Sequence, residues 1–181
     1  MSRIPLQTAT SAPAASQPLL GQVQSAFGAT PNMFKAVANS PAALASMWGS
    51  FGALGKGSLP ARLTEKLAVA VADRNRCEYC LAAHTLLGKN AGASESEMAE
   101  AQSGRSADPA TAAALAFALK VVDRRADVSD ADIAGLREVG FDDEAIVELL
   151  AHVALNLFTN YVNIAFDVPV DFPAVKLRQA A

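Results

Sequence analysis

The chain has 181 residues, of which 51% are hydrophobic, and its mean hydropathy is +0.21. This length and apolar content suit one globular domain with a buried core, and they exclude a disordered chain. The net charge of −3 and the lack of a basic cluster argue against nucleic acid and anionic membranes as partners.

Residues 1–17 are rich in Ser, Thr, Ala and Pro, lack helical periodicity, and are predicted to form a flexible N-terminal arm. Residues 18–181 are predicted to form a single domain of helices only, because no segment shows the polar–apolar alternation of a strand. Helix start and stop signals divide this domain into about seven to nine helices. The expected helices begin near Leu19 and then cover 31–38, 41–54, 58–74, 78–90, a short segment after Ser94, 109–125, 129–139 and 142–165. An extended strap is expected over 167–172.

Two segments bear on localisation. The first residues contain no continuous apolar stretch of the kind found in secretory signals. The most apolar stretch, 145–166, is interrupted by Glu148, His152 and several Asn residues, which favours a buried core helix over a membrane span. We therefore expect a cytoplasmic protein with no membrane partner.

The two cysteines, Cys77 and Cys80, form a Cys-x-x-Cys motif at the start of a predicted helix. A spacing of three places both sulfurs on one helix face, and His84 lies one turn further along that face. A helix N-terminus and a nearby imidazole both favour the nucleophilic thiolate. Because His84 is closer to Cys80, we expect Cys80 to attack and Cys77, at the helix edge near solvent, to resolve.

Glu65 lies on the preceding predicted helix, on a face of small apolar residues. A partly desolvated carboxylate there would have a raised pKa and could accept a proton. An ordinary exposed helix glutamate fits the pattern equally well.

A polar stripe interrupts the last predicted helix, at spacings of four, four and three residues: His152, Asn156, Asn160 and Asn163. It predicts either hydrogen bonds between helices or subunits, or a pocket wall that faces the cysteines. In the second interpretation, His152 and Asn156 are candidate pocket or relay residues.

The spacing of Glu65, the Cys77–Cys80 motif and His84 resembles that of the alkylhydroperoxidase D-like group of the carboxymuconolactone decarboxylase superfamily. Flanking segments that fit are 31–34, 40–42, 59–62 and 89–92, and the resemblance covers about residues 28–172. It implies an all-helical bundle, assembly into trimers or hexamers, and peroxidase activity on a hydroperoxide with an external dithiol reductant and no cofactor. It also implies that Cys80 is peroxidatic, that Cys77 resolves, and that His84 and Glu65 relay protons.

One position departs from the family pattern. Tyr79 stands where many family peroxidases have a histidine, and a phenol is a poor base near pH 7. Tyr79 is therefore a candidate pocket or weak relay residue, and the departure predicts a weaker relay or a different substrate.

Three alternatives remain open from the sequence. A zinc-binding module could use Cys77, Cys80, His84 and His152. A decarboxylase-type lyase could use His84 and Glu65 as acid and base, although that branch generally lacks the cysteine pair. A permanent structural disulfide would contribute little, because closing so short a loop stabilises the fold by only about 2 kcal/mol.

Overall fold

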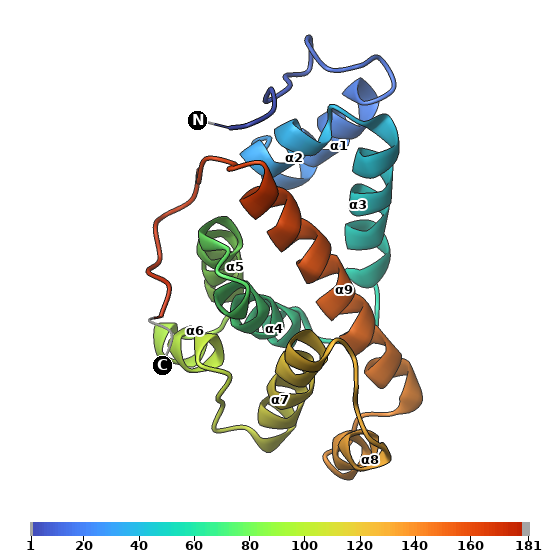
Figure 1. Cartoon of the computed structure of the whole chain (residues 1–181), viewed down its shortest axis with the longest axis vertical. Coiled ribbons are helices and arrows are strands. Elements are labelled where there is room, and N and C mark those ends of the chain that lie inside the picture. The colour runs from blue at the N-terminus through green and yellow to red at the C-terminus, as the bar shows by residue number, and fades with distance from the viewer. Residues whose placement is uncertain (1, 179–181) are drawn as a thin grey trace.

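Nine helices and no strand make up residues 2–178, the part of the chain that this computed structural model describes (Figure 1). Met1 and the last three residues of the predicted domain, 179–181, lie outside it. The helices are α1 (Gln17–Phe27), α2 (Asn32–Val37), α3 (Pro41–Leu54), α4 (Ala61–Arg74), α5 (Glu78–Asn90), α6 (Glu95–Gln102), α7 (Pro109–Arg124), α8 (Asp130–Glu138) and α9 (Asp143–Ala165). The all-α prediction is confirmed.

Local capping explains why several boundaries were predictable. The Ser40 side chain accepts a hydrogen bond from the N–H of Ala43 at the start of α3, and Ser94 forms a reciprocal capping box with Glu97 at α6. One boundary differs from expectation, because Pro60 has an extended conformation with ψ 138° and caps α4 instead of lying in its first turn.

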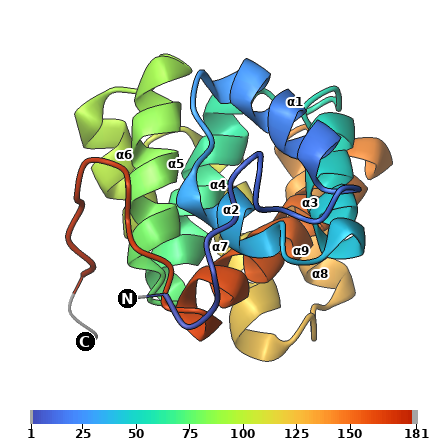
Figure 2. The same cartoon turned by 90° about the horizontal axis from the view of Figure 1, so that it is seen from above.

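The helices α4 and α9 form the centre of the molecule. The segment Lys66–Ala72 of α4 is buried, and α4 packs against α5, α6, α7 and α9. Figure 1 shows α9 crossing the molecule diagonally, with α3 on one side and α4 and α5 on the other. The view from above shows α1 and α2 covering the end of this assembly (Figure 2).

By length and composition alone, α9 could cross a membrane, with a mean hydropathy of 1.4 in its most apolar window. However, 56% of that window is buried inside the structure, and the helix packs against α3, α4, α5 and α7. Its polar residues Asn156, Asn160 and Asn163 are buried as well. The helix is therefore the core element that the interrupted apolar pattern predicts.

The first and last segments that the structure describes both contact this helical body. In the N-terminal arm, the N–H of Arg3 donates to the carbonyl of Phe166 over 2.8 Å. After α9 the chain continues as an extended strap, residues 167–178, that passes α5 and reaches α6 (Figure 1). The strap is fixed there by a hydrogen bond of 2.9 Å from Gln102 Nε2 to the carbonyl of Lys176.

Candidate active site

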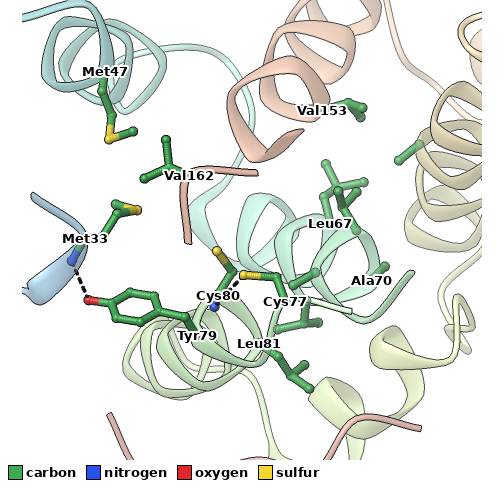
Figure 3. Packing of buried hydrophobic residues seen from close by; sticks show 14 of the residues in the cluster. Met33, Met47, Leu67, Ala70, Cys77, Tyr79, Cys80, Leu81, Val153 and Val162 are labelled. Atoms are coloured by element: carbon green, nitrogen blue, oxygen red, sulfur yellow. Dashed lines mark hydrogen bonds between the residues drawn. The ribbon is translucent and has the colours of Figure 1, made fainter. Parts of the chain in front are cut away.

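The cysteine pair lies at the tight corner between α4 and α5. The chain turns at Arg76, which has a left-handed φ of 62°, and this turn makes Cys77 the N-cap of α5. Both cysteines are free thiols, and the N–H of Cys80 donates to the sulfur of Cys77 over 3.3 Å (Figure 3). The two sulfurs therefore share one face of the first turn, as the spacing predicts.

Neither sulfur is open to bulk solvent. Cys77 is 1% exposed and Cys80 is 2% exposed. The expectation that Cys77 reaches solvent at the helix edge is therefore wrong for the side chain itself, because the end of α9 and the start of the strap lie over the corner. The residue Cys77 instead borders a hollow that opens to the surface.

His84 and Glu65 form a direct pair, with 2.7 Å between Nδ1 of the imidazole and Oε2 of the carboxylate. Burial disfavours charge on His84, but the Glu65 charge, its hydrogen bond and the Cys80 thiolate together raise the pKa of His84. Because Nδ1 is engaged by Glu65, Nε2 is the ring nitrogen that remains for a second partner.

The close packing of α4 on α5 depends on Gly88, one turn after His84. A Cβ at this position would lie 3.3 Å from the Cβ of Glu65 and 2.4 Å from Cε of Met98. Both distances are too short for a larger side chain without displacement. Glycine here therefore lets Glu65 approach His84.

Two asparagines of α9 complete the surroundings of Cys80. Asn163 Nδ2 donates to the Cys80 sulfur over 3.2 Å. Burial raises the pKa of Cys80, but hydrogen bonding with Cys77, the charge of His84, and the Asn163 and Asn160 side chains outweigh it and lower the pKa to about 7. Hydrogen bonding to the Cys80 thiolate, burial and the charge of that thiolate raise the pKa of Cys77. Cys80 is therefore the more acidic of the two thiols.

Cys80 and His84 share a small apolar cavity of about 40 Å³. Its wall is mostly aromatic and aliphatic and comes from α1, α2, α3, α5, α9 and the strap: Phe27, Pro31, Met33, Phe34, Phe51, Tyr79, Ala83, Leu87, Thr159 and Phe172. This aromatic cavity is where a small apolar molecule could meet the reactive sulfur.

On its other side, His84 borders a second cavity of about 180 Å³, which Glu65, His152 and Asn156 also line. The Nε2 atom of His152 is buried there without a hydrogen-bond partner among the described residues. Burial lowers the pKa of His152, which outweighs the opposite influence of Glu148 and Glu65. Most of the remaining lining is apolar, and we name this space the polar cavity after its Glu65, His84, His152 and Asn156 side chains. The polar cavity joins a neutral imidazole to the Glu65–His84 pair.

The comparisons with known proteins agree with this geometry. A family model described as the carboxymuconolactone decarboxylase family matches residues 40–124. The structure of a peroxidase-related protein from Ralstonia eutropha JMP134, described as an alkylhydroperoxidase AhpD core, superposes with a TM-score of 0.85 and 26% identity, covering 94% of this chain and 92% of that chain.

The fold of this chain is that of the AhpD-like group. A peroxidase-related protein from Silicibacter sp. TM1040 matches this chain with 25% identity and a TM-score of 0.82, over 93% of this chain and 91% of that chain. The debrominase Bmp8, solved with 2,3,4-tribromopyrrole, shares the fold at 21% identity and a TM-score of 0.78, over 93% and 91% of the two chains. No curated protein sequence matches significantly.

The structure brings together the four predicted catalytic side chains, Glu65, Cys77, Cys80 and His84. Tyr79 lines the aromatic cavity, but its hydroxyl accepts the N–H of Met33 over 3.1 Å and points away from the sulfurs (Figure 3). Burial also raises the pKa of this phenol. Tyr79 is thus a wall and an anchor for α2.

The polar stripe of α9 serves two places. His152 and Asn156 line the polar cavity, whereas Asn163 contacts the Cys80 sulfur and Asn160 accepts a hydrogen bond of 2.9 Å from Asn75 Nδ2. The contact with the sulfur was missed as a specific role, although the spacing of the stripe pointed to it.

The zinc alternative is not supported by side-chain placement. Within residues 2–178, no group of three or more His, Cys, Asp and Glu side chains is arranged to hold a metal ion. His152 lies with Glu65 and His84 at the polar cavity, which the cysteines do not line. The proposed four-ligand set is therefore not assembled.

Proposed function

We propose that this protein is a thiol-dependent peroxidase in which Cys80 is the peroxidatic cysteine and Cys77 resolves. The observation that carries the proposal is the setting of the Cys80 sulfur, to which the Asn163 amide donates over 3.2 Å, beside the hydrogen-bonded Glu65–His84 pair. This setting lowers the pKa of Cys80 to about 7. An ordinary cysteine with a pKa near 8.5 is only about 3% ionised at pH 7. At a pKa of about 7, half of the Cys80 population is the reactive thiolate.

The first step is attack of the Cys80 thiolate on the distal oxygen of a hydroperoxide. The O–O bond breaks, a sulfur–oxygen bond forms, and Cys80 becomes a sulfenic acid. The leaving alkoxide needs a proton, which the imidazolium of His84 supplies from Nε2. Glu65 supports this transfer because its carboxylate stabilises the imidazolium.

The second step is condensation of Cys77 with the sulfenic acid. The thiol of Cys77 gives its proton to His84, its sulfur bonds to Cys80, and the departing hydroxide takes a proton and leaves as water. Because the pKa of Cys77 is raised, it stays a thiol until a base is adjacent. The product is a Cys77–Cys80 disulfide, which an external dithiol then reduces.

His152 and Asn156 extend the relay in this proposal. The neutral imidazole of His152 and the carboxylate of Glu65 line the same cavity of about 180 Å³, which is large enough for water. Water between them would return protons from the surface to His84. Tyr79 takes the role of a cavity wall and not of a base.

The proposed partners follow from the same chemistry. The substrate is a hydroperoxide, the reductant is a dithiol, and no cofactor is required. A homo-oligomer, a trimer or hexamer, is supported by apolar side chains exposed along α9: Val147, Leu150, Phe158 and Tyr161. A cytoplasmic location suits free thiols that must be reduced in each cycle.

The direct test is peroxide consumption by the reduced protein with a dithiol present. Wild-type protein should turn over, Cys80→Ser should be inactive, and Cys77→Ser should react once and stop at the sulfenic acid. Unchanged turnover by Cys80→Ser would exclude the proposal.

A second candidate is an acid–base lyase of the decarboxylase type. It is favoured by one observation, that Glu65, His84 and His152 line a cavity to which neither cysteine contributes. Lyase activity on a carboxylated lactone should persist in a Cys77→Ser, Cys80→Ser double variant. Activity that disappears with the cysteines would remove this candidate.

A further inference from the structure

The two cysteines border different cavities. Cys80 lines the aromatic cavity described above, whereas Cys77 lines a separate hollow of about 350 Å³ at the surface. The hollow is formed by the start of α5, the end of α9 and the first strap residues: Arg76, Glu78, Tyr79, Asn163, Ile164, Asp167, Val168, Pro169 and Val170. Among the described residues, Tyr79 alone lines both, so the two cysteines border separate cavities.

We propose that this hollow, the Cys77 hollow, is the docking site for a slim dithiol reductant, which attacks the sulfur of Cys77 while the hydroperoxide uses the aromatic cavity. The inference rests on the peroxidase function proposed above. It adds the place where the reductant docks and the sulfur that it attacks.

The asymmetry of the pair selects Cys77 as the sulfur under attack. In thiol–disulfide exchange, the sulfur with the lower pKa leaves more readily. The low pKa of Cys80 makes it the better leaving group, and Asn163 Nδ2 lies 3.2 Å from its sulfur to stabilise the charge that forms. Attack at Cys77 therefore expels the stabilised thiolate.

A buried acceptor at the Cys77 hollow supports a thiol ligand independently. Asn163 is 4% exposed, lines the hollow, and its Oδ1 atom has no hydrogen-bond partner among the described residues. A buried unpaired carbonyl oxygen is costly unless a ligand or water completes it. The S–H group of an incoming dithiol can donate to it.

The dimensions favour a slim molecule. Cys77 is 1% exposed, so a reductant must place its sulfur inside the hollow of about 350 Å³. A thiol lying flush with the surface of a folded protein would not reach it. Ile164 and Val170, which are 43% and 40% exposed, give the hollow an apolar rim.

The reaction balances without a further oxidant or reductant. The first thiolate of the dithiol bonds to the Cys77 sulfur, the Cys77–Cys80 bond breaks, and Cys80 leaves as a thiolate. The second thiol then attacks the reductant sulfur of the mixed disulfide, and its proton ends on Cys77. The products are a cyclic disulfide, the Cys77 thiol, the Cys80 thiolate and one proton from the first thiol.

The test separates the two half-reactions in stopped flow. Val170→Trp should fill the Cys77 hollow and slow reduction of the oxidised protein by dithiothreitol at least tenfold, while the rate of oxidation by hydroperoxide changes less than twofold. The matched control is Ala174→Trp, an exposed strap residue outside the hollow, which should change neither rate. Unchanged reduction in Val170→Trp, or slowed oxidation instead, would overturn the docking site.

A second measurement locates the attacked sulfur. Oxidised protein is treated with a monothiol, quenched in acid and digested, and fragmentation of the peptide 77–89 should place the adduct on Cys77. An adduct on Cys80, or reduction by a folded dithiol protein but not by dithiothreitol, would contradict the proposal. If the reduced protein does not react with hydroperoxide at all, the peroxidase function fails, whichever sulfur carries the adduct.

Discussion

The side-chain amide of Asn163 donates a hydrogen bond of 3.2 Å to the sulfur of Cys80. This contact joins two helices far apart in the sequence, α9 and α5, at the reactive atom. It also gives α9, the longest helix of the described chain, a chemical role besides its role in the core.

Removing this contact should make Cys80 less acidic. A hydrogen bond to a charged group contributes about 1.5–3 kcal/mol, so Asn163→Ala should raise the pKa of Cys80 by about 1–2 units. Thiolate absorbance near 240 nm measures the shift. The matched control Asn39→Ala, whose side chain bonds Pro5 at the surface, should leave the pKa unchanged, and an unchanged pKa in Asn163→Ala would show that the contact does not act on the thiolate.

The rate at which hydroperoxide oxidises the reduced protein should show a bell-shaped dependence on pH. It should rise through about pH 7 as Cys80 ionises, and fall at higher pH as His84 loses its proton, at a pKa above its ordinary value. Glu65→Gln removes the charge that holds this pKa up, so the falling limb should move to lower pH. If the falling limb of the Glu65→Gln profile stayed at the wild-type pH, Glu65 would not take part in the proton relay.

His152 and Tyr79 should differ in proton transfer. His152→Gln should lower turnover several-fold, and added imidazole should restore part of it, because a small base can enter the polar cavity. Tyr79→Phe should keep the pH profile but lose about 1 kcal/mol of folding stability with the Met33 hydrogen bond. If added imidazole instead restored the activity of Tyr79→Phe alone, Tyr79 and not His152 would be the residue that transfers protons.

Gly88 should be the least replaceable helical glycine at the site. Gly88→Val adds atoms against Met98 and Glu65, and overpacking of this kind costs about 1–3 kcal/mol. Thermal unfolding should show the loss, and NMR should show a lower pKa for His84 as Glu65 is displaced. Gly49→Val, where a Cβ meets nothing within 4 Å, is the control and should preserve that pKa.

Local signals in the sequence predicted much of the fold. The bounds of α3 and α5 agree with the prediction, because Ser40–Pro41 and the cysteine corner are short-range signals. The spacing of Cys77, Cys80 and His84 likewise depends on one helix only. Features that depend on contacts between different helices could not be predicted from such short-range signals.

The remaining features depend on long-range packing. The sequence left Glu65 open between an exposed residue and a proton acceptor, and only the packing of α4 on α5 at Gly88 places it on His84. The contact of Asn163 with Cys80 spans 83 positions. The burial of Cys77 likewise depends on segments far away in sequence, the end of α9 and the strap.

Titration of the thiols in the fully reduced protein, before and after one equivalent of hydroperoxide, decides whether Cys80 and Cys77 form a peroxide-reducing pair. Wild-type protein should lose two thiols to an intramolecular Cys77–Cys80 disulfide, whereas Cys80→Ser should lose none. If both thiols persist in the wild-type protein after exposure to hydroperoxide, the two cysteines are not such a pair.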